Sequence, residues 1–232
     1  MSGLTKDGDS KTNIAGRETS TADLPSSARL PAAAAGNVRE RLLFDDDWRF
    51  ALGNGCDAQM DFSYGTGQGF AKAGDAAGPF SPKFDDREWR KLNLPHDWVV
   101  ELPFEKSTEF SLDSHGYKPI GVNYPENSIG WYRKTFEIPA ADEGKRIAMV
   151  FDGVFRDSQV WVNGHLLARN LSGYIGFRCD LTDYLNYGGK NVVVVRIDAT
   201  QVEGWFYEGA GIYRHVWLVK TAPVNIAPNG TV

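Results

Sequence analysis

The stretch VWVNGHLL (residues 160–167) carries the clearest structural signal in the chain. Asn163-Gly164 separates two runs in which apolar and polar side chains alternate, as they do in strands with one buried face. A two-residue type I′ turn needs a positive φ at both central positions, and Asn and Gly tolerate that conformation best. The stretch therefore predicts a β-hairpin with its turn at Asn163-Gly164.

Strand-like segments follow one another on both sides of this hairpin. They are short, they lie roughly 8 to 20 residues apart, and Gly, Asn, Asp or Pro stands between them, which is typical of an all-β sandwich or barrel. The predicted strands are residues 47–53, 131–138, 146–154, 157–162, 165–170, 191–198 and 215–221.

The apolar positions of these segments predict one hydrophobic core. The hydrophobic fraction of 42% over 232 residues is sufficient to form it. We expect the core to contain Phe136, Ile138, Ile147, Met149, Phe151, Val160, Val162, Leu166, Val193, Val195, Ile197, Val216 and Leu218.

Two segments depart from the strand pattern. In residues 180–191, DLTDYLNYGGKN, the i, i+4 spacing of Leu181 and Leu185 and a possible N-cap at Thr182 predict one short helix, ended by Gly188-Gly189. Residues 53–82 are rich in glycine and show no sustained period. This stretch is long for a connection in a compact domain, so it is interpreted as a functional loop or an insertion.

The N-terminus differs from the rest of the chain. Its first 36 residues contain one Ile, three Leu and no aromatic residue, and such a segment cannot bury enough apolar surface to become ordered. We expect residues 1–39 to form a disordered tail. Since LPAAAAG is too short for the apolar region of a signal peptide, the chain as written predicts a cytoplasmic location, or a periplasmic one if the start codon is misassigned.

Charge and cysteine content narrow the range of partners. The formal charge is −5, and Lys and Arg are scattered, which disfavours a nucleic-acid partner. No run approaches the roughly 18 apolar residues that span a bilayer, so no membrane partner is expected. Cys56 and Cys179 lie far apart without a CxxC or His-rich neighbourhood, which favours two ordinary thiols over a zinc site or a disulfide.

The titratable residues do not assemble into a catalytic set. His165 and His215 fall in predicted strands, where structural roles are the usual ones. His96 stands beside Asp97 in LPHDW, but neighbours in an extended segment point in different directions. We interpret LPHDW as a tight corner in which His96 and Asp97 bind backbone groups while Trp98 packs inward. The sequence predicts no catalytic residue, no metal site and no cofactor.

Glycosidase chemistry needs two carboxylates that face each other across the scissile bond. Most acidic residues here stand in turns, and only Glu208 has aromatic neighbours that could perturb its pKa. A single carboxylate does not make the required pair.

Aromatic residues point instead to sugar binding. A pyranose ring packs its C–H face on aromatic rings, and its hydroxyl groups bind to Asn, Asp, Glu and Arg. The candidate substrate-binding residues are Asn123 in GVNYPEN and the consecutive Trp205, Phe206, Tyr207 and Glu208. Three consecutive aromatic side chains cannot all enter one core from an extended segment.

The residues after this aromatic run have a structural interpretation. In AGIYRHV (210–216), we expect Gly211 to adopt an unusual backbone conformation and Ile212 to anchor the segment in the core. We expect Arg214 to pair with a buried acid where the last strand begins.

An ordered set of motifs resembles one known family. The motifs are LNLPHDW (92–98), GWYRKTFEIP (130–139), FDGVFRDSQVWVNGHLL (151–167), GYIGFRCDLTDYL (173–185), NVVVVRID (191–198) and YEGAGIYRHVWL (207–218). Over about residues 40–222 they resemble the N-terminal sugar-binding domain of glycoside hydrolase family 2, and most of all its bacterial β-galactosidase branch. The resemblance implies a jelly-roll β-sandwich.

The resemblance also implies a domain order. In the family this domain precedes an immunoglobulin-like sandwich and a (β/α)₈ barrel, whose two glutamates act by retention. Residues 40–222 would be the sugar-binding domain, and residues 223–232 would begin the second domain. The expected partners are then a β-galactoside or related oligosaccharide and the barrel, with oligomerisation left open. This chain alone is expected to be inactive.

The sugar-contacting loops implied by the resemblance are those around Asn123 and at Trp205–Glu208. Many relatives have Arg-Trp-Tyr where this chain has Trp205-Phe206-Tyr207, and no acid stands where another branch binds sodium, so no sodium site is predicted. The alternatives are a stand-alone carbohydrate-binding module, another family 2 activity (β-glucuronidase or β-mannosidase), and a domain that only braces the barrel.

Overall fold

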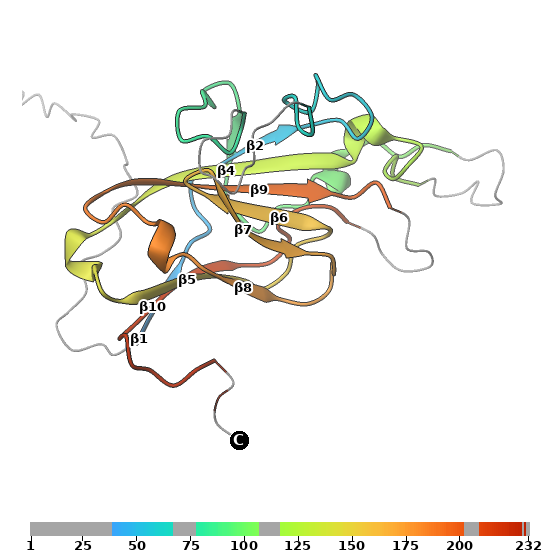
Figure 1. Ribbon diagram of the computed structural model, residues 1–232. Coiled ribbons are helices and arrows are strands. Elements are labelled where there is room, and N and C mark those ends of the chain that lie inside the picture. Colours follow the sequence, from blue (N-terminus) through green and yellow to red (C-terminus); the bar gives the residue numbers. More distant parts are fainter. Residues whose placement is uncertain (1–38, 67–77, 107–116, 202–208, 229, 231–232) are drawn as a thin grey trace, which may run out of the picture.

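The computed structural model describes residues 39–66, 78–106, 117–201, 209–228 and 230. They form a jelly-roll β-sandwich of two antiparallel sheets (Figure 1). The four-stranded sheet has the order β1 (Arg39–Leu43), β10 (Val216–Thr221), β5 (Arg146–Phe151), β8 (Phe177–Asp180). The six-stranded sheet has the order β3 (Arg90–Leu92), β2 (Trp48–Leu52), β4 (Ile129–Ile138), β9 (Gly189–Asp198), β6 (Ser158–Val162), β7 (His165–Asn170). The all-β prediction is confirmed.

Each of the seven predicted strand segments contains a strand, and three further strands were missed. β3 has only three residues, and β1 and β8, with the sequences RERLL and FRCD, carry no sustained alternation. Residues 1–38 of the expected tail lie outside the described residues, and Arg39 already belongs to β1.

The predicted hairpin is present between β6 and β7. Asn163 and Gly164 have φ values of 49° and 87°, as a type I′ turn requires. The Asn163 side chain also joins the turn to neighbouring segments. Its Oδ1 accepts from the amide of Val192 at 2.9 Å, and its Nδ2 donates to the carbonyl oxygen of Tyr184 at 2.7 Å.

The predicted core lies between the two sheets, with one exception. Every predicted core residue except Leu166 belongs to the main buried cluster. Leu166 pairs with Trp161 across the hairpin, and both face the outer side of the six-stranded sheet, so Leu166 is only partly buried. The alternation that sends Val160 and Val162 inward sends Trp161 outward.

The outer face of the six-stranded sheet carries a second apolar cluster. It contains Phe80, Trp89, Ile129, Trp131, Trp161, Val192 and Val194. Phe62 and Tyr64, from the glycine-rich stretch, pack against this cluster. Buried Asp61 fixes the same stretch to the sheet, because it accepts from Nε1 of Trp131 at 2.6 Å and pairs with Arg196 at 2.7 Å. The described part of the stretch therefore covers the outer face of the sheet.

The predicted short helix is reduced to one 3₁₀ turn, η5 (Thr182–Tyr184). Leu185 is already extended, with φ −92° and ψ 142°. Asn186 and Asn191 explain the early end, because the Asn186 amide donates to Asn191 Oδ1 and Asn191 Nδ2 donates back to the Asn186 carbonyl oxygen. The other short helices are η2 (Trp98–Glu101), η3 (Pro125–Asn127) and η4 (Ala140–Asp142). Within the described ranges, no helix has the length and apolar character needed to cross a bilayer.

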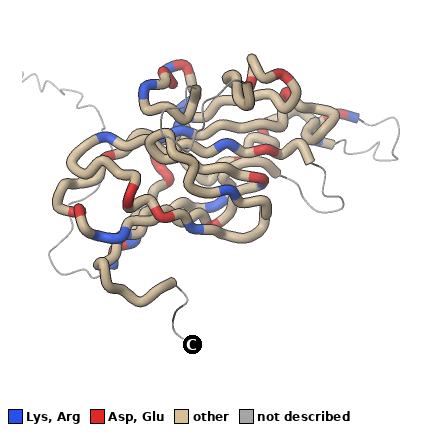
Figure 2. The backbone as a smooth tube through the Cα atoms, in the orientation of Figure 1, with Lys and Arg blue, Asp and Glu red and all other residues tan. Residues whose placement is uncertain are grey.

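Charged residues of both signs alternate along the described backbone and do not gather into one stripe (Figure 2). One buried group of charges is an exception. Asp142 accepts from Lys220 at 2.6 Å and from Lys145 at 2.7 Å, and Lys145 also pairs with Glu40 at 3.3 Å. Because these residues come from η4, from β10, from the turn before β5 and from β1, the group connects the edge strand β1 to the sheet.

We predict that Asp142→Asn lowers the free energy of unfolding by about 3 kcal/mol at pH 7, because Lys220 loses its closest buried counter-charge. Burial alone would raise the pKa of Asp142, but hydrogen bonds from Lys145 and Lys220 outweigh it and lower that pKa. A depressed carboxyl pKa contributes stability above the unfolded-state value of about 3.9 and loses it as pH falls through the folded value.

Urea unfolding between pH 7 and pH 2.5 tests this. The unmodified chain should lose more stability below about pH 4 than the Asp142→Asn variant does. Asp85→Asn, which removes an exposed partner of Arg87, should change little at neutral pH. Parallel pH profiles for the unmodified chain and Asp142→Asn would contradict the assignment.

Candidate functional site

One end of the sandwich collects the long connections. β1, β2, β5, β7 and β9 end there, and β4, β6, β8 and β10 begin there, as the antiparallel pairings require (Figure 1). We call it the loop end. Both segments with sequence-predicted sugar contacts leave from it, namely the segment that precedes β4 and the one that follows β9.

Asp97 joins the corner at residues 94–98 to the segment that leads into β10. Its Oδ1 accepts from the amide of Val99 at 2.9 Å and from the amide of Ala210 at 3.0 Å. The Trp98 amide donates to the Ala210 carbonyl oxygen at 3.0 Å, so the corner at residues 94–98 is paired with the segment that leads into β10. The prediction that Asp97 binds backbone groups and that Trp98 packs inward is confirmed.

The segment before β4 is bound to the same region. The Trp98 indole donates to the Asn127 carbonyl oxygen at 2.7 Å, and the Ala199 amide donates to the Ser128 carbonyl oxygen at 2.8 Å. Buried Ser128 also accepts from the Gly121 amide at 2.8 Å through its hydroxyl oxygen. Residues 119–128 therefore lie beside the start of the β9–β10 connection and beside the corner.

The structure places one of the five predicted sugar contacts. Asn123 is exposed at the loop end, and its side chain makes no hydrogen bond to another described residue. Trp205, Phe206, Tyr207 and Glu208 lie outside the described residues. The described residues on either side of the undescribed range are fixed, since Ala199 bonds to Ser128 and Ala210 bonds to Asp97 and Trp98.

The prediction that His96 binds backbone groups was wrong, because its ring takes part in a side-chain network. Its Nδ1 lies 2.6 Å from the Tyr132 hydroxyl, and its Nε2 lies 2.6 Å from Arg90 Nη2 and 3.2 Å from Glu101 Oε1. Burial lowers the pKa of His96 despite the opposing effect of Glu101, so the neutral ring is favoured at pH 7. Sequence reasoning missed Arg90 and Glu101, since neither belongs to a recognisable motif.

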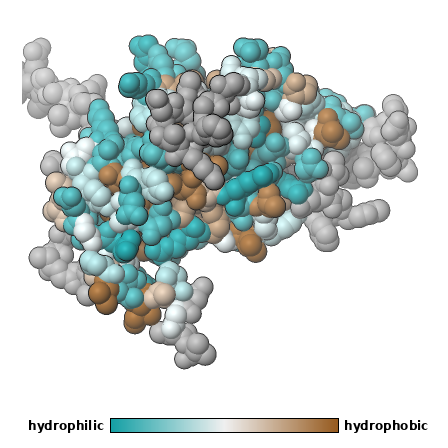
Figure 3. Space-filling view, in the orientation of Figure 1, coloured by the Kyte–Doolittle hydropathy of each residue, from teal (hydrophilic) through white to brown (hydrophobic). Residues whose placement is uncertain are grey.

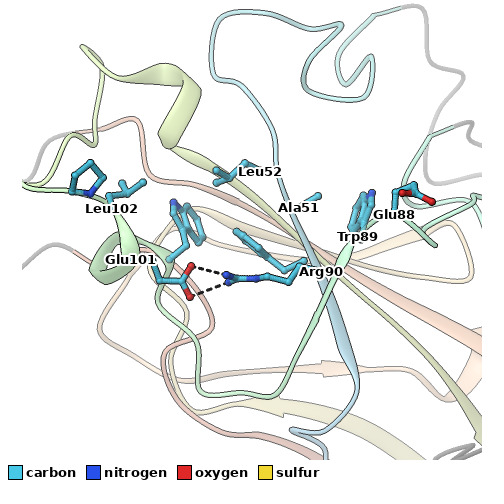
Figure 4. Close-up of a pocket in the computed structure, with 10 residues that line it drawn as sticks. Ala51, Leu52, Glu88, Trp89, Arg90, Glu101 and Leu102 are labelled. Carbon is cyan, nitrogen blue, oxygen red and sulfur yellow. Dashed lines mark hydrogen bonds and ion pairs between the residues drawn. The ribbon is translucent and has the colours of Figure 1, made fainter.

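An open pocket of about 460 Å³ lies beside this network. Figure 4 shows the Arg90–Glu101 ion pair, at 2.8 Å, inside a lining that includes Leu52, Leu102 and Trp89. The pairing of β2 with β3 stops at Phe50 and Arg90, so Leu52 has no strand partner on this side. The pocket thus offers charged hydrogen-bonding groups and apolar walls together, which suits a ligand with both hydroxyl groups and a C–H surface.

The expectation for Arg214 was wrong. Arg214 is exposed and lies over the ring of Tyr213, 5.2 Å from its centroid, and no ion pair to a described acid is found. The following residue makes the expected type of contact instead. Nδ1 of His215 lies 2.6 Å from Oδ2 of buried Asp45, whose Oδ1 accepts from the Val216 amide at 2.8 Å. The expected pairing with a buried acid is therefore made by the residue that directly follows Arg214.

The expectations for Gly211 and Ile212 are confirmed. Gly211 has a φ of 143°, and a Cβ at this position would overlap the carbonyl oxygen of His96. Its amide and carbonyl groups pair with Phe155 at 2.8 and 2.9 Å. Ile212 is fully buried in the main core. A side chain at Gly211 would therefore push the corner away from the β9–β10 connection.

No group of three or more His, Cys, Asp or Glu side chains in the described ranges could hold a metal ion. Cys56 is exposed and Cys179 is buried, both as free thiols.

Comparison with known proteins gives consistent matches. Residues 43–222 match the sequence profile of "Glycosyl hydrolases family 2, sugar binding domain". A β-galactosidase of Bacteroides ovatus is 41% identical over 194 residues, 83% of this chain and 19% of that enzyme. A putative β-glucuronidase of Formosa agariphila is 40% identical over 146 residues, 62% of this chain and 13% of that protein.

Solved structures show the same relationship. A β-glycosidase from Bacteroides vulgatus has a TM-score of 0.59 at 35% identity, with 79% of this chain and 20% of that chain covered. The chain spans about a fifth of the length of relatives such as these.

We predict that Asp97→Ala lowers the free energy of unfolding by about 3 kcal/mol, because the amides of Val99 and Ala210 each lose their acceptor. Asp97→Asn keeps an acceptor oxygen and should recover most of the loss. Asp183→Ala removes an exposed carboxylate and should stay within about 0.5 kcal/mol. Urea unfolding measures all three, and an Asp97→Ala variant as stable as Asp183→Ala would contradict the role given to Asp97.

Proposed function

The chain belongs to glycoside hydrolase family 2 through its sugar-binding domain, and from this premise we propose that it is the sugar-binding part of a retaining β-glycosidase that acts on β-galactosides. In this proposal the domain contributes sugar contacts from the loop end. Two carboxylates on a separate barrel domain perform the cleavage, one as acid/base and one as nucleophile.

One observation carries the location of these contacts. The segment of Asn123 and both ends of the connection that carries Trp205–Glu208 are fixed next to each other by Asp97, Trp98 and Ser128. Contacts from two distant parts of the sequence can then reach one ligand. The β-galactosidase from Bacteroides ovatus, at 41% identity, supports galactoside as the sugar.

A β-glucuronide is the second candidate substrate. It is favoured by relatives named β-glucuronidase, including the protein from Formosa agariphila at 40% identity. A stand-alone carbohydrate-binding module would use the same loop end without a barrel. The reading frame after Val232 separates this alternative from the enzyme, because only the enzyme needs a barrel with a catalytic glutamate.

We predict that the 232-residue chain binds lactose or galactose with a dissociation constant on the order of millimolar, as expected for a partial site. Titration with tryptophan fluorescence measures this binding. Trp205→Ala should weaken it about tenfold or more, because a stacked aromatic contact is worth roughly 1–3 kcal/mol. Trp217→Phe, on the opposite sheet, serves as the control and should bind like the unmodified chain. Absence of any sugar response at about 50 mM would reject a binding role.

We also predict that this chain alone does not hydrolyse a nitrophenyl β-galactoside above the buffer rate. Retention needs two carboxyl groups about 5–5.5 Å apart on opposite sides of the glycosidic bond, and the proposal assigns both to the barrel. Release of nitrophenol measures the rate. Turnover that persists through repeated purification and scales with chain concentration would overturn this assignment.

A further inference from the structure

A hydrogen-bonded cluster of two tyrosines and a glutamate adjoins Asn123. Glu105 and Tyr117 lie opposite each other, and their backbone groups bond in both directions at 2.8 and 2.7 Å. Tyr124 joins them from the segment before β4. Its hydroxyl lies 2.5 Å from the Tyr117 hydroxyl and donates to Glu105 Oε2 at 3.0 Å.

The direction of the hydrogen bonds in this cluster is fixed. A phenol has one hydrogen, and the hydrogen of Tyr124 is given to Glu105, so Tyr117 must be the donor in the tyrosine pair. Each bond thus points toward the Glu105 carboxylate. Hydrogen bonds with Tyr117 and then Glu105 also raise the pKa of Tyr124, which keeps the phenol protonated.

The cluster has unused acceptor capacity that faces solvent. An ionised carboxylate offers about four lone-pair positions, and Glu105 is exposed and accepts only from Tyr124 among the described side chains. Exposed Asn123 precedes Tyr124 and adds an amide with both donor and acceptor groups. These groups match the hydroxyl groups of a sugar, which can donate to the carboxylate and bond to the amide.

The Glu105 carboxylate forms no ion pair with a described residue. Lys118 does not compensate Glu105, because its ammonium donates to the carbonyl oxygens of Val100 and Leu102, at 3.1 and 2.5 Å, and lies over the Phe104 ring. Neither Lys118 nor Lys106 forms an ion pair with Glu105 in the described part of the chain.

We propose that Glu105, Tyr124 and Asn123 form a hydroxyl-binding subsite at the loop end that selects an uncharged sugar over a uronic acid. The inference rests on the proposed function, since it places one of the sugar contacts and gives it a specificity. Glu105 accepts hydroxyl hydrogens of the sugar, Tyr124 and Tyr117 hold the carboxylate in place, and Asn123 bonds to a further hydroxyl.

The selectivity follows from the carboxylate. Sugar hydroxyl groups gain charge-assisted hydrogen bonds to Glu105, whereas the carboxylate of a uronic acid would face the like charge of Glu105, which no described Lys or Arg pairs with. Such a juxtaposition penalises the wrong ligand and so discriminates between two sugars of the same shape.

Binding of methyl β-galactoside and methyl β-glucuronide to the 232-residue chain, followed by ligand-observed NMR, tests the subsite. The unmodified chain should bind the galactoside at least about tenfold more tightly than the glucuronide. Glu105→Gln should weaken galactoside binding about tenfold, since a hydrogen bond to a charged group is lost, and should reduce the preference. Tyr124→Phe should weaken galactoside binding less, because the carboxylate remains but is held less firmly.

Glu126→Gln is the matched control, because it removes the same charge from the neighbouring segment and leaves the cluster intact. It should retain both the affinity and the preference. Urea midpoints close to that of the unmodified chain should show that each variant is folded. If Glu105→Gln does not fold, Glu105→Asp gives a second measurement. This variant keeps the negative charge, so the preference for the galactoside should persist.

The outcomes separate this inference from the proposed function. Galactoside binding that is unchanged in Glu105→Gln would overturn the subsite and leave the sugar-binding role intact. Equal or tighter binding of the glucuronide by the unmodified chain would overturn the selectivity and favour the glucuronidase alternative. Absence of binding of either glycoside would reject the sugar-binding role itself, and the subsite with it.

Discussion

A single carboxylate oxygen organises the loop end. Asp97 Oδ1 accepts from Val99, its neighbour two residues on, and from Ala210, more than a hundred residues away. Both amides are removed from water, so the acceptor has to be present for the corner and the β9–β10 connection to lie side by side. Gly211 completes the constraint, because only a residue without a side chain fits against the His96 carbonyl group. The positions of Trp98, Asn127 and Ser128 follow from this junction.

The regular part of the fold is predictable because it rests on local patterns. Alternation marks the long strands, and the Asn163-Gly164 turn marks the hairpin, since both depend on residues a few positions apart. Where the prediction failed, a specific side-chain contact outside the local pattern decides the outcome. Leu166 faces outward because Trp161 opposite it does, and the expected helix ends early because Asn186 and Asn191 bond to each other. The pairing with a buried acid that was expected for Arg214 is made by His215 instead, with Asp45 between β1 and β2.

Only part of the candidate site could be predicted from the sequence, because most of its residues depend on partners elsewhere in the chain. Asn123 stands in a recognisable motif, and the structure places it on the exposed side of the loop end. Glu105, Tyr117, Arg90 and Glu101 carry no motif and acquire their meaning from partners up to 19 residues away, such as Tyr124 for Glu105. Residues that hold the junction together are buried or partly buried, whereas the groups with free hydrogen-bonding capacity are exposed beside it. On the face seen in Figure 3, hydrophobic residues form separate small patches rather than one continuous surface.

The turn at Asn163 has a practical consequence for engineering. Hairpin tips are commonly chosen for peptide tags and fluorescent fusions because they are short and lie at the surface. Here the tip also connects to two other segments, because the Asn163 side chain bonds to Tyr184, Asn191 and Val192. A tag inserted at this turn would separate those segments from the hairpin, so the surface position does not make it a permissive site.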